Sequence, residues 1–184
     1  MRYVKRMLRL RSAFFLLLVC LSCLAVGVPA RAGNPPDHLD TLTISIWLEY
    51  DRPGALYIYR GQLPAGLDLP ARLTFRLPRS SGGPSSTAGI DNEGKYRYIR
   101  PIVNEDGETT VVSYEVSWPR FQLEYYEDAL RRQGNNRQLD FIYRPEYAIG
   151  QLVLEIKEPY GASNFVLDPA ADTRSQAEDG LTVH

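Results

Sequence analysis

Residues 42–78 read LTISIWLEYDRPGALYIYRGQLPAGLDLPARLTFRLP, and this stretch decides the fold. Apolar and polar residues alternate along it with a period of two, which is the repeat of a β-strand with one buried face. Prolines and glycines separate the alternating runs where turns are needed. The pattern therefore predicts strands, and it contains no catalytic or cofactor-binding signature.

Two strands joined by a turn open this stretch. Residues 42–50 and 55–63 alternate, and the segment 52–55 between them fits a type II turn, with Pro53 setting φ and Gly54 accepting a positive φ. In the second strand we expect Leu56 and Ile58 to face inward. The core expected from the whole stretch comprises Leu42, Ile44, Ile46, Leu48, Leu56, Ile58, Leu73, Phe75 and Leu77.

Further strands are expected downstream, at 71–78, 95–103, 109–118, 121–125, 138–144 and 151–157. Turn residues separate them, and only residues 128–132 suggest a helical turn. About eight short strands without a long helix are typical of an all-β domain. We expect a single two-sheet antiparallel sandwich, either immunoglobulin-like or jelly-roll.

The first 32 residues have the composition of a secretory signal peptide. Basic residues between Arg2 and Arg11 precede an uncharged apolar run at 13–28, and Ala30 and Ala32 form a small-x-small cleavage site. We expect export to the periplasm or the extracellular space, with an uncleaved membrane anchor as the alternative. Lipid attachment at Cys23 is a weaker reading, because Cys20 stands where a lipid-attachment motif has an aliphatic residue.

The remaining chain divides into a polar lead-in at 33–41, a β-sandwich domain at 42–158, and a tail at 159–184. In the tail we expect a short strand at 164–167 and a flexible end, because the composition is small, polar and acidic. Both cysteines precede residue 33, so the domain has no disulfide and no thiolate ligand. Beyond residue 32 lie all 22 acidic but only 15 of the 21 basic residues, which gives a formal net charge of −7. That charge argues against nucleic acid and anionic membrane surfaces as partners.

Three segments carry a resemblance to a known group of proteins: IWLEYDRPGALYIYRG at 46–61, LPARLTFRLP at 69–78 and LEIKEPYGASNFVLDPA at 154–170. Together they resemble uncharacterised exported bacterial β-sandwich proteins of the carboxypeptidase-regulatory-like or immunoglobulin-like kind. The resemblance implies a sandwich fold and a location in the cell envelope. It implies no activity, since the shared motifs are structural.

No catalytic motif, nucleotide-binding loop or zinc-protease signature is present, so no enzyme is predicted. The two histidines, His38 and His184, lie near chain ends expected to be mobile. The nearest carboxylate groups, Glu49 with Asp51 and a cluster at 124–128, leave a small glycan-active hydrolase as an alternative. The acidic turns 91–94 and 104–108 lack the ligand register of an EF-hand, and we predict neither metal nor cofactor.

Aromatic residues are the strongest indication of a binding surface. If Tyr57, Tyr59, Tyr96 and Tyr98 share the solvent face of one sheet, they form a flat platform, to which Trp47 adds a further ring. Such rings stack on sugars or anchor a protein partner, although strand propensity alone also explains their presence. We therefore expect a non-catalytic binding or structural module of the bacterial envelope with a protein or glycan partner, and a carbohydrate-binding module is the first alternative.

Overall fold

The computed structural model describes residues 33–184, and this part of the chain is all-β. The predicted signal peptide lies outside the described residues. The first eight strands are β1 (His38–Leu48), β2 (Ala55–Gln62), β3 (Ala71–Pro78), β4 (Ser86–Ile90), β5 (Tyr96–Tyr98), β6 (Ile102–Asp106), β7 (Thr109–Val116) and β8 (Arg120–Glu127). Five follow: β9 (Arg131–Gln133), β10 (Asn136–Gln138), β11 (Ala148–Lys157), β12 (Ser175–Gln176) and β13 (Thr182–Val183), and the one helical element here is the 3-10 turn Arg79–Ser81.

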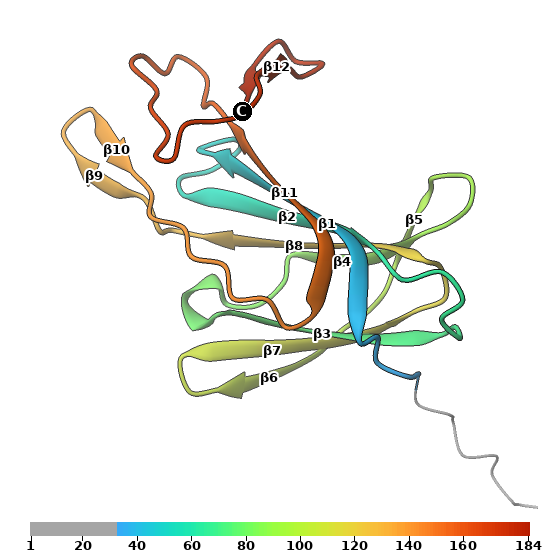
Figure 1. Ribbon diagram of the computed structural model, residues 1–184. Coiled ribbons are helices and arrows are strands. Elements are labelled where there is room, and N and C mark those ends of the chain that lie inside the picture. The colour runs from blue at the N-terminus through green and yellow to red at the C-terminus, as the bar shows by residue number, and fades with distance from the viewer. Residues whose placement is uncertain (1–32) are drawn as a thin grey trace, which may run out of the picture. The chain divides into compact units, whose positions relative to one another are not determined.

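The strands form a large sheet, a small sheet and a separate hairpin (Figure 1). The large sheet has the order β12-β13-β11-β1-β2-β8-β4-β5, the small sheet has the order β3-β7-β6, and β9 pairs with β10. The expectation of purely antiparallel sheets is wrong, because β11 runs parallel to β1 from Ala148 to Lys157. A parallel neighbour needs a long crossover, and nearly a hundred residues separate these two strands in the sequence.

The hairpin predicted from residues 42–63 forms, but its loop comprises residues 49–54 in place of the four-residue turn predicted at 52–55. β1 and β2 pair antiparallel from Thr41 opposite Gln62 to Leu48 opposite Ala55. The turn closes with a hydrogen bond in which the Glu49 amide donates to the Gly54 carbonyl (2.8 Å), and Gly54 has a φ of 105°. Glycine is suited to this position because it adopts a positive φ without steric cost.

The core lies between the small sheet and one face of the large sheet. Phe75 of β3 meets Phe121 of β8 at 5.7 Å between ring centroids and Tyr59 of β2 at 6.2 Å. Six predicted core residues are confirmed as fully buried on these facing surfaces: Leu42, Ile44, Ile46, Leu73, Phe75 and Leu77. Leu48 is only half-buried, since it lies at the end of β1.

The predicted orientation of β2 is wrong. In the register of the sheet Tyr57 pairs with Ile46, and Tyr59 pairs with Ile44, so the tyrosines share the inner face with the core of β1. Leu56 and Ile58 therefore point to the outer face, where they are nevertheless buried. Period two defines two faces of a strand, but when both faces carry apolar rings or chains it does not say which one is inside.

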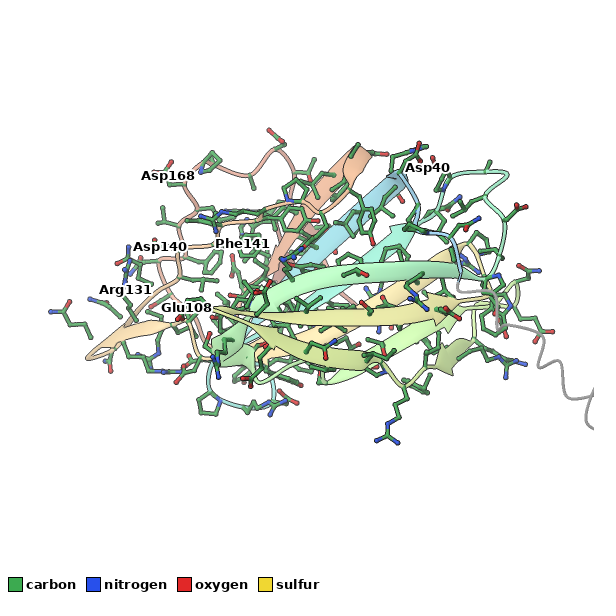
Figure 2. All side chains as sticks on the ribbon, turned by 90° about the horizontal axis from the view of Figure 1, so that it is seen from below. Asp40, Glu108, Arg131, Asp140, Phe141 and Asp168 are labelled. Atoms are coloured by element: carbon green, nitrogen blue, oxygen red, sulfur yellow. The ribbon has the colours of Figure 1, made fainter. Side chains whose placement is uncertain are left out.

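The segment between β8 and β11 also differs from the prediction. The helical turn expected at 128–132 is replaced by the β9–β10 hairpin, and the strand expected at 138–144 is absent. Phe141, labelled in Figure 2, instead lies in an irregular segment and stacks on Tyr57 at 5.6 Å between centroids. This segment contributes Leu139, Phe141, Tyr143 and Tyr147 to the edge of the core.

Both ends of the described chain are more structured than predicted. Asn34 of the lead-in forms a bridge with Ala71, and β1 begins at His38 rather than at residue 42. The strand expected at 164–167 is absent, whereas β12 and β13 extend the large sheet. Within residues 33–184 no helix is both long and apolar enough to cross a membrane.

Candidate functional site: an aromatic groove beside strand β5

The five aromatic residues singled out from the sequence do not form one surface. Tyr57 and Tyr59 lie on the inner face of the large sheet. Tyr96 and Tyr98 lie on the outer face. Tyr98 pairs with Ala88 of β4, and Ala88 pairs with Gln122, an outer residue of β8. Trp47 is also on the outer face, but β2, β8 and β4 separate its strand from β5. The proposed platform of four tyrosines is therefore wrong.

Tyr57 and Tyr59 have a structural role in the core. Tyr57 stacks on Tyr125 with ring centroids 4.7 Å apart and an interplanar angle of 7°, and the Tyr59 and Tyr125 hydroxyls are 3.3 Å apart. Burial raises the pKa of Tyr59 to about 12 and raises the pKa of Tyr57 and of Tyr125 still further. Each of these phenols therefore stays protonated over the physiological range, as expected of packing residues.

Trp47 is already engaged by its own chain. The Lys157 ammonium lies 4.2 Å from the centre of the Trp47 ring, and Tyr50 packs edge-on against that ring at 4.7 Å. Lys157 is itself almost fully buried and forms an ion pair with Asp179. A cavity of about 160 Å³ is enclosed there between the end of β1 and the chain that follows β11. The contacts of Trp47 thus serve to attach the C-terminal residues to the sheet.

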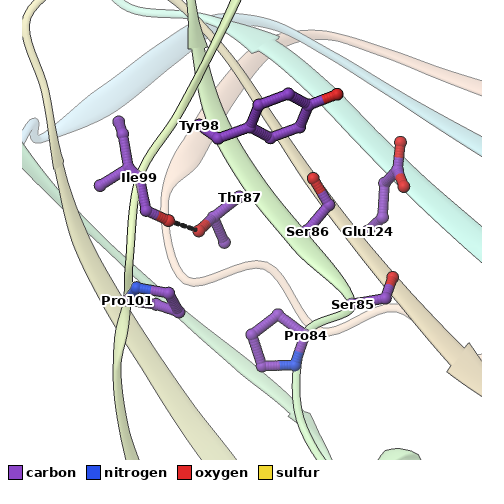
Figure 3. A pocket seen from close by; sticks show the side chains of 8 residues that line it. All are labelled: Pro84, Ser85, Ser86, Thr87, Tyr98, Ile99, Pro101 and Glu124. Atoms are coloured by element: carbon purple, nitrogen blue, oxygen red, sulfur yellow. Dashed lines mark hydrogen bonds between the residues drawn. The ribbon is translucent and has the colours of Figure 1, made fainter.

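Tyr98 is the most exposed of the five predicted aromatic residues, with 78% of its surface exposed against 41% for Tyr96. It forms one wall of an open groove of about 390 Å³ at the β4–β5 edge of the large sheet. Figure 3 shows the Tyr98 ring above Ser86, with Glu124 beside it and the two prolines of the groove on the other side. The lining residues are Pro84, Ser85, Ser86, Thr87, Tyr98, Ile99, Pro101 and Glu124.

The groove forms where the chain leaves the large sheet for the small one. Thr87 holds the departing chain through two hydrogen bonds: its hydroxyl donates to the Ile99 carbonyl (2.6 Å), and its own carbonyl accepts from the Ile99 amide (2.9 Å). Pro101 follows within two residues and cannot donate to a ladder, so the strand ends there. Ile99 packs against the core, which fixes the base of the groove.

The turn between β4 and β5 is stabilised by Asp91. Its Oδ1 accepts hydrogen bonds from the Glu93 amide (3.0 Å) and the Lys95 amide (2.8 Å), and its Oδ2 accepts from Arg97 Nε (2.8 Å). The hydrogen bond from the Lys95 amide, together with those from Arg97 and the Glu93 amide, lowers the pKa of Asp91. The Asp91 carboxylate of the acidic turn 91–94 is thus occupied by hydrogen bonds within the hairpin, and the expected turn joins the antiparallel strands β4 and β5.

A line of polar side chains leads across the sheet to the groove. Arg60 Nε donates to Gln122 Oε1 (2.6 Å), and Gln122 Nε2 donates to Glu124 Oε1 (2.5 Å). These contacts fix the Glu124 carboxylate at the groove edge and leave its second oxygen without a partner among residues 33–184. The Ser85 and Ser86 hydroxyls likewise have no partner within that range. The groove therefore offers hydroxyls, one carboxylate and one aromatic ring.

The residues considered for catalysis are dispersed and paired elsewhere. His38 Nδ1 lies 2.6 Å from Asp37, and His184 Nε2 lies 2.6 Å from Glu158. Glu49 forms ion pairs with Arg132 and Arg137 at the β9–β10 hairpin. Between residues 33 and 184 no group of three or more histidine, cysteine, aspartate or glutamate side chains is arranged to hold a metal ion.

Comparison with protein-family models, with curated proteins and with solved structures gives no match for this chain. The resemblance to exported bacterial sandwich proteins therefore stays a prediction, and the geometry of the groove has to carry the functional argument alone.

Sequence reasoning found Tyr98 but missed the other walls of the groove. Ser85 and Ser86 belong to a glycine- and serine-rich stretch that reads as a plain surface loop. The sequence indicates Glu124 only as a member of the acidic cluster at 124–128, whereas the sheet register places it opposite Ser86. To find these residues from the sequence, one would need to know that β4 pairs with β8, and the order of the strands along the chain does not reveal that pairing.

Proposed function

We propose that this protein is a non-catalytic binding module of the bacterial cell envelope that takes a neutral glycan in the groove beside Tyr98. The observation that carries the proposal is the exposed Tyr98 ring, which lines one groove together with two serine hydroxyls and a fixed carboxylate. A sugar ring presents an apolar face that stacks on an aromatic side chain and hydroxyl groups that exchange hydrogen bonds with polar neighbours. The Tyr98 wall of the groove can stack on the apolar face of a sugar, and the wall with the serines and Glu124 can exchange hydrogen bonds with its hydroxyl groups.

The composition of the groove also favours binding over hydrolysis. Glycoside hydrolysis needs two carboxyl groups facing each other across the bond that is cut. Among the described residues that line the groove, Glu124 alone carries a carboxyl group. Its hydrogen bond from Gln122 orients it to accept from a ligand hydroxyl. The hydrolase alternative therefore has less support than a binding role.

The envelope location rests on the N-terminal sequence, which predicts a secretory signal peptide. The architecture suits such a role: we propose an incomplete two-sheet sandwich, in which three strands cover part of an eight-strand sheet. The groove lies at the β5 end of the opposite face, where Tyr98, Ser86 and Glu124 are found, whereas Leu56, Ile58 and Gln122 in the middle of that face are buried. The immunoglobulin-like and jelly-roll topologies are less suitable descriptions, since the large sheet has a parallel pair.

The test is a glycan array followed by titration calorimetry on any glycan retained, comparing the native protein with Tyr98→Ala and Tyr96→Ala. Tyr96 is the matched control because it lies on the same face of β5 but does not line the groove. We expect Tyr98→Ala to weaken binding about ten-fold, as loss of a stacked ring implies, and Tyr96→Ala to change it little. A blank array, or equal effects of both variants, would refute the glycan proposal.

A further inference from the structure

Strand β3, an edge of the small sheet, is closed by contacts from other parts of the chain. Its outward amides donate in strict alternation: Arg72 to the Asn34 carbonyl (3.1 Å), Thr74 to the Tyr147 hydroxyl (2.7 Å) and Arg76 to Glu146 Oε1 (2.7 Å). Two of the three acceptors are side chains placed there by the segment that leads into β11. Such capping prevents another strand from pairing with the edge.

Two other edge strands are short or charged. β5 has only three residues, with Arg97 at its centre. β6 contains Glu105, which pairs with Arg79 (2.6 Å), and Asp106, which pairs with Arg76 (3.7 Å). Short length and charge are both common means of keeping an edge from unwanted pairing.

Strand β11 differs from these edges because most of its outer side has no such protection. β13 pairs with it only at its end, where the Ile156 amide donates to the His184 carbonyl (3.1 Å) and the Ile156 carbonyl accepts from the His184 amide (3.0 Å). Backbone groups alternate between the two sides of a strand, so those of Gly150, Leu152 and Leu154 point to the same side as those of Ile156. Within residues 33–184, no strand pairs with β11 on that side before Ile156.

The inner face of the same stretch of β11 is apolar, and Val153 adds one apolar side chain to the outer face, between Gln151 and Glu155. Leu152 and Leu154 continue the inner face of β1, since they pair with Leu42 and Ile44, yet about half of each side chain is exposed. Val153, on the outer face, is 37% exposed. An exposed, long, apolar edge strand is a template for pairing with another chain.

We propose that this edge pairs with the β11 edge of a second copy of the same chain, antiparallel and about a two-fold axis at Leu152. The free backbone amides and carbonyls of Gly150 and Leu154 lie symmetrically on either side of Leu152. In the dimer those of Gly150 therefore meet those of Leu154 of the second copy, and those of Leu152 meet their own equivalents. Leu154 then lies opposite Gly150, which has no side chain to obstruct it.

The charges along β11 and the length of its free edge both agree with a second copy of the chain as the occupant. In this register Gln151 lies opposite Val153, and Ile149 lies opposite Glu155, so no like charges meet across the interface. β13 limits the available ladder to the residues before Ile156, and the second copy is limited at the same point. The inference is independent of the glycan groove, which lies at the opposite end of the large sheet.

Sedimentation equilibrium of the full-length protein over a wide concentration range tests the proposal. Leu152→Lys places two ammonium groups opposite each other at the axis, and we expect it to raise the dimer dissociation constant at least about ten-fold. Val166→Lys is the matched control, because it adds the same charge at an exposed apolar residue away from β11 and should leave the constant unchanged. Circular dichroism confirms that both variants keep the native strand content.

Hydrogen exchange supplies a second measurement that does not depend on a variant. As the protein concentration rises, the amides of Leu152 and Leu154 should gain protection, whereas that of Val153, which points toward β1, should not change. A native protein that stays monomeric at every concentration overturns the proposal. A dimer that is equally sensitive to both lysine substitutions, or that leaves the Leu152 amide unprotected, overturns it as well.

Discussion

Replacing Tyr57 by alanine tests the orientation of β2, on which the separation between core and binding surface depends. The ring is 1% exposed and is stacked between Tyr125 and Phe141, with centroid distances of 4.7 and 5.6 Å. A buried aromatic side chain removes about 150–250 Å² from water, which at about 25 cal/mol per Å² gives an upper bound of about 4–6 kcal/mol. Measured aromatic-to-alanine substitutions in cores cost about 3–5 kcal/mol, and we expect a value in that range.

The assay is urea unfolding followed by tryptophan fluorescence, with Tyr98→Ala as the control. Tyr98 is largely exposed, so its loss should change the free energy of unfolding by no more than about 0.5 kcal/mol. The m-values of both variants should match that of the native protein, because the surface exposed on unfolding is nearly the same. If Tyr57→Ala cost less than about 1 kcal/mol, or no more than Tyr98→Ala, the stacked core described above would be wrong.

Two further predictions concern the same core. Desolvation raises the pKa of Tyr59 to about 12 and that of Tyr57 and Tyr125 further, so the native state holds protons that the unfolded chain loses near pH 10. The contribution of these tyrosines to stability is therefore complete below about pH 10 and is lost as the pH rises through their pKa values in the folded state. In an alkaline absorbance titration, these phenols should ionise only as the near-ultraviolet circular dichroism of the folded protein disappears. Gly61→Ala should destabilise the protein by about 1–3 kcal/mol in thermal unfolding, because a Cβ there would lie 2.3 Å from Phe121 Cζ; an unchanged melting temperature would show that the Phe121 ring moves aside freely.

Much of the fold follows from local pattern, and the departures have definite physical causes. The β1–β2 hairpin was predictable because the alternation and the Pro53-Gly54 turn agree with each other. Which face of β2 is buried was not predictable, because tyrosine is amphipathic and fits either face of a strand. The parallel contact of β1 with β11 was also beyond reach, because a pairing across about a hundred residues leaves no mark in the local sequence.

The groove was predictable only in its aromatic wall. Tyr98 stood out as one member of an alternating pair, whereas Ser86 and Glu124 meet it through the pairing of β4 with β8. Grouping Tyr98 with Tyr57 required the two strands to present tyrosines on the same face. The register shows that Tyr98 shares its face with Gln122 and Arg60, so the neighbours of a surface residue were set by strand order rather than by composition.

Strand β11 presents the clearest conflict between a sequence pattern and its position in the fold. Residues 151–157 alternate, with Leu152, Leu154 and Ile156 on one face and mostly polar residues on the other, which is typical of a strand whose apolar face is covered. β11 runs parallel to β1, yet its other side is free before Ile156, and Leu152 and Leu154 on its inner face are about half exposed. The chain protects β3 with side chains from the residues immediately before β11, so protection of an edge lies within the reach of that segment. An unprotected apolar edge beside a protected one is best explained by a strand that completes the sheet, and the symmetry of the free groups about Leu152 makes a second copy of β11 the simplest strand to do so.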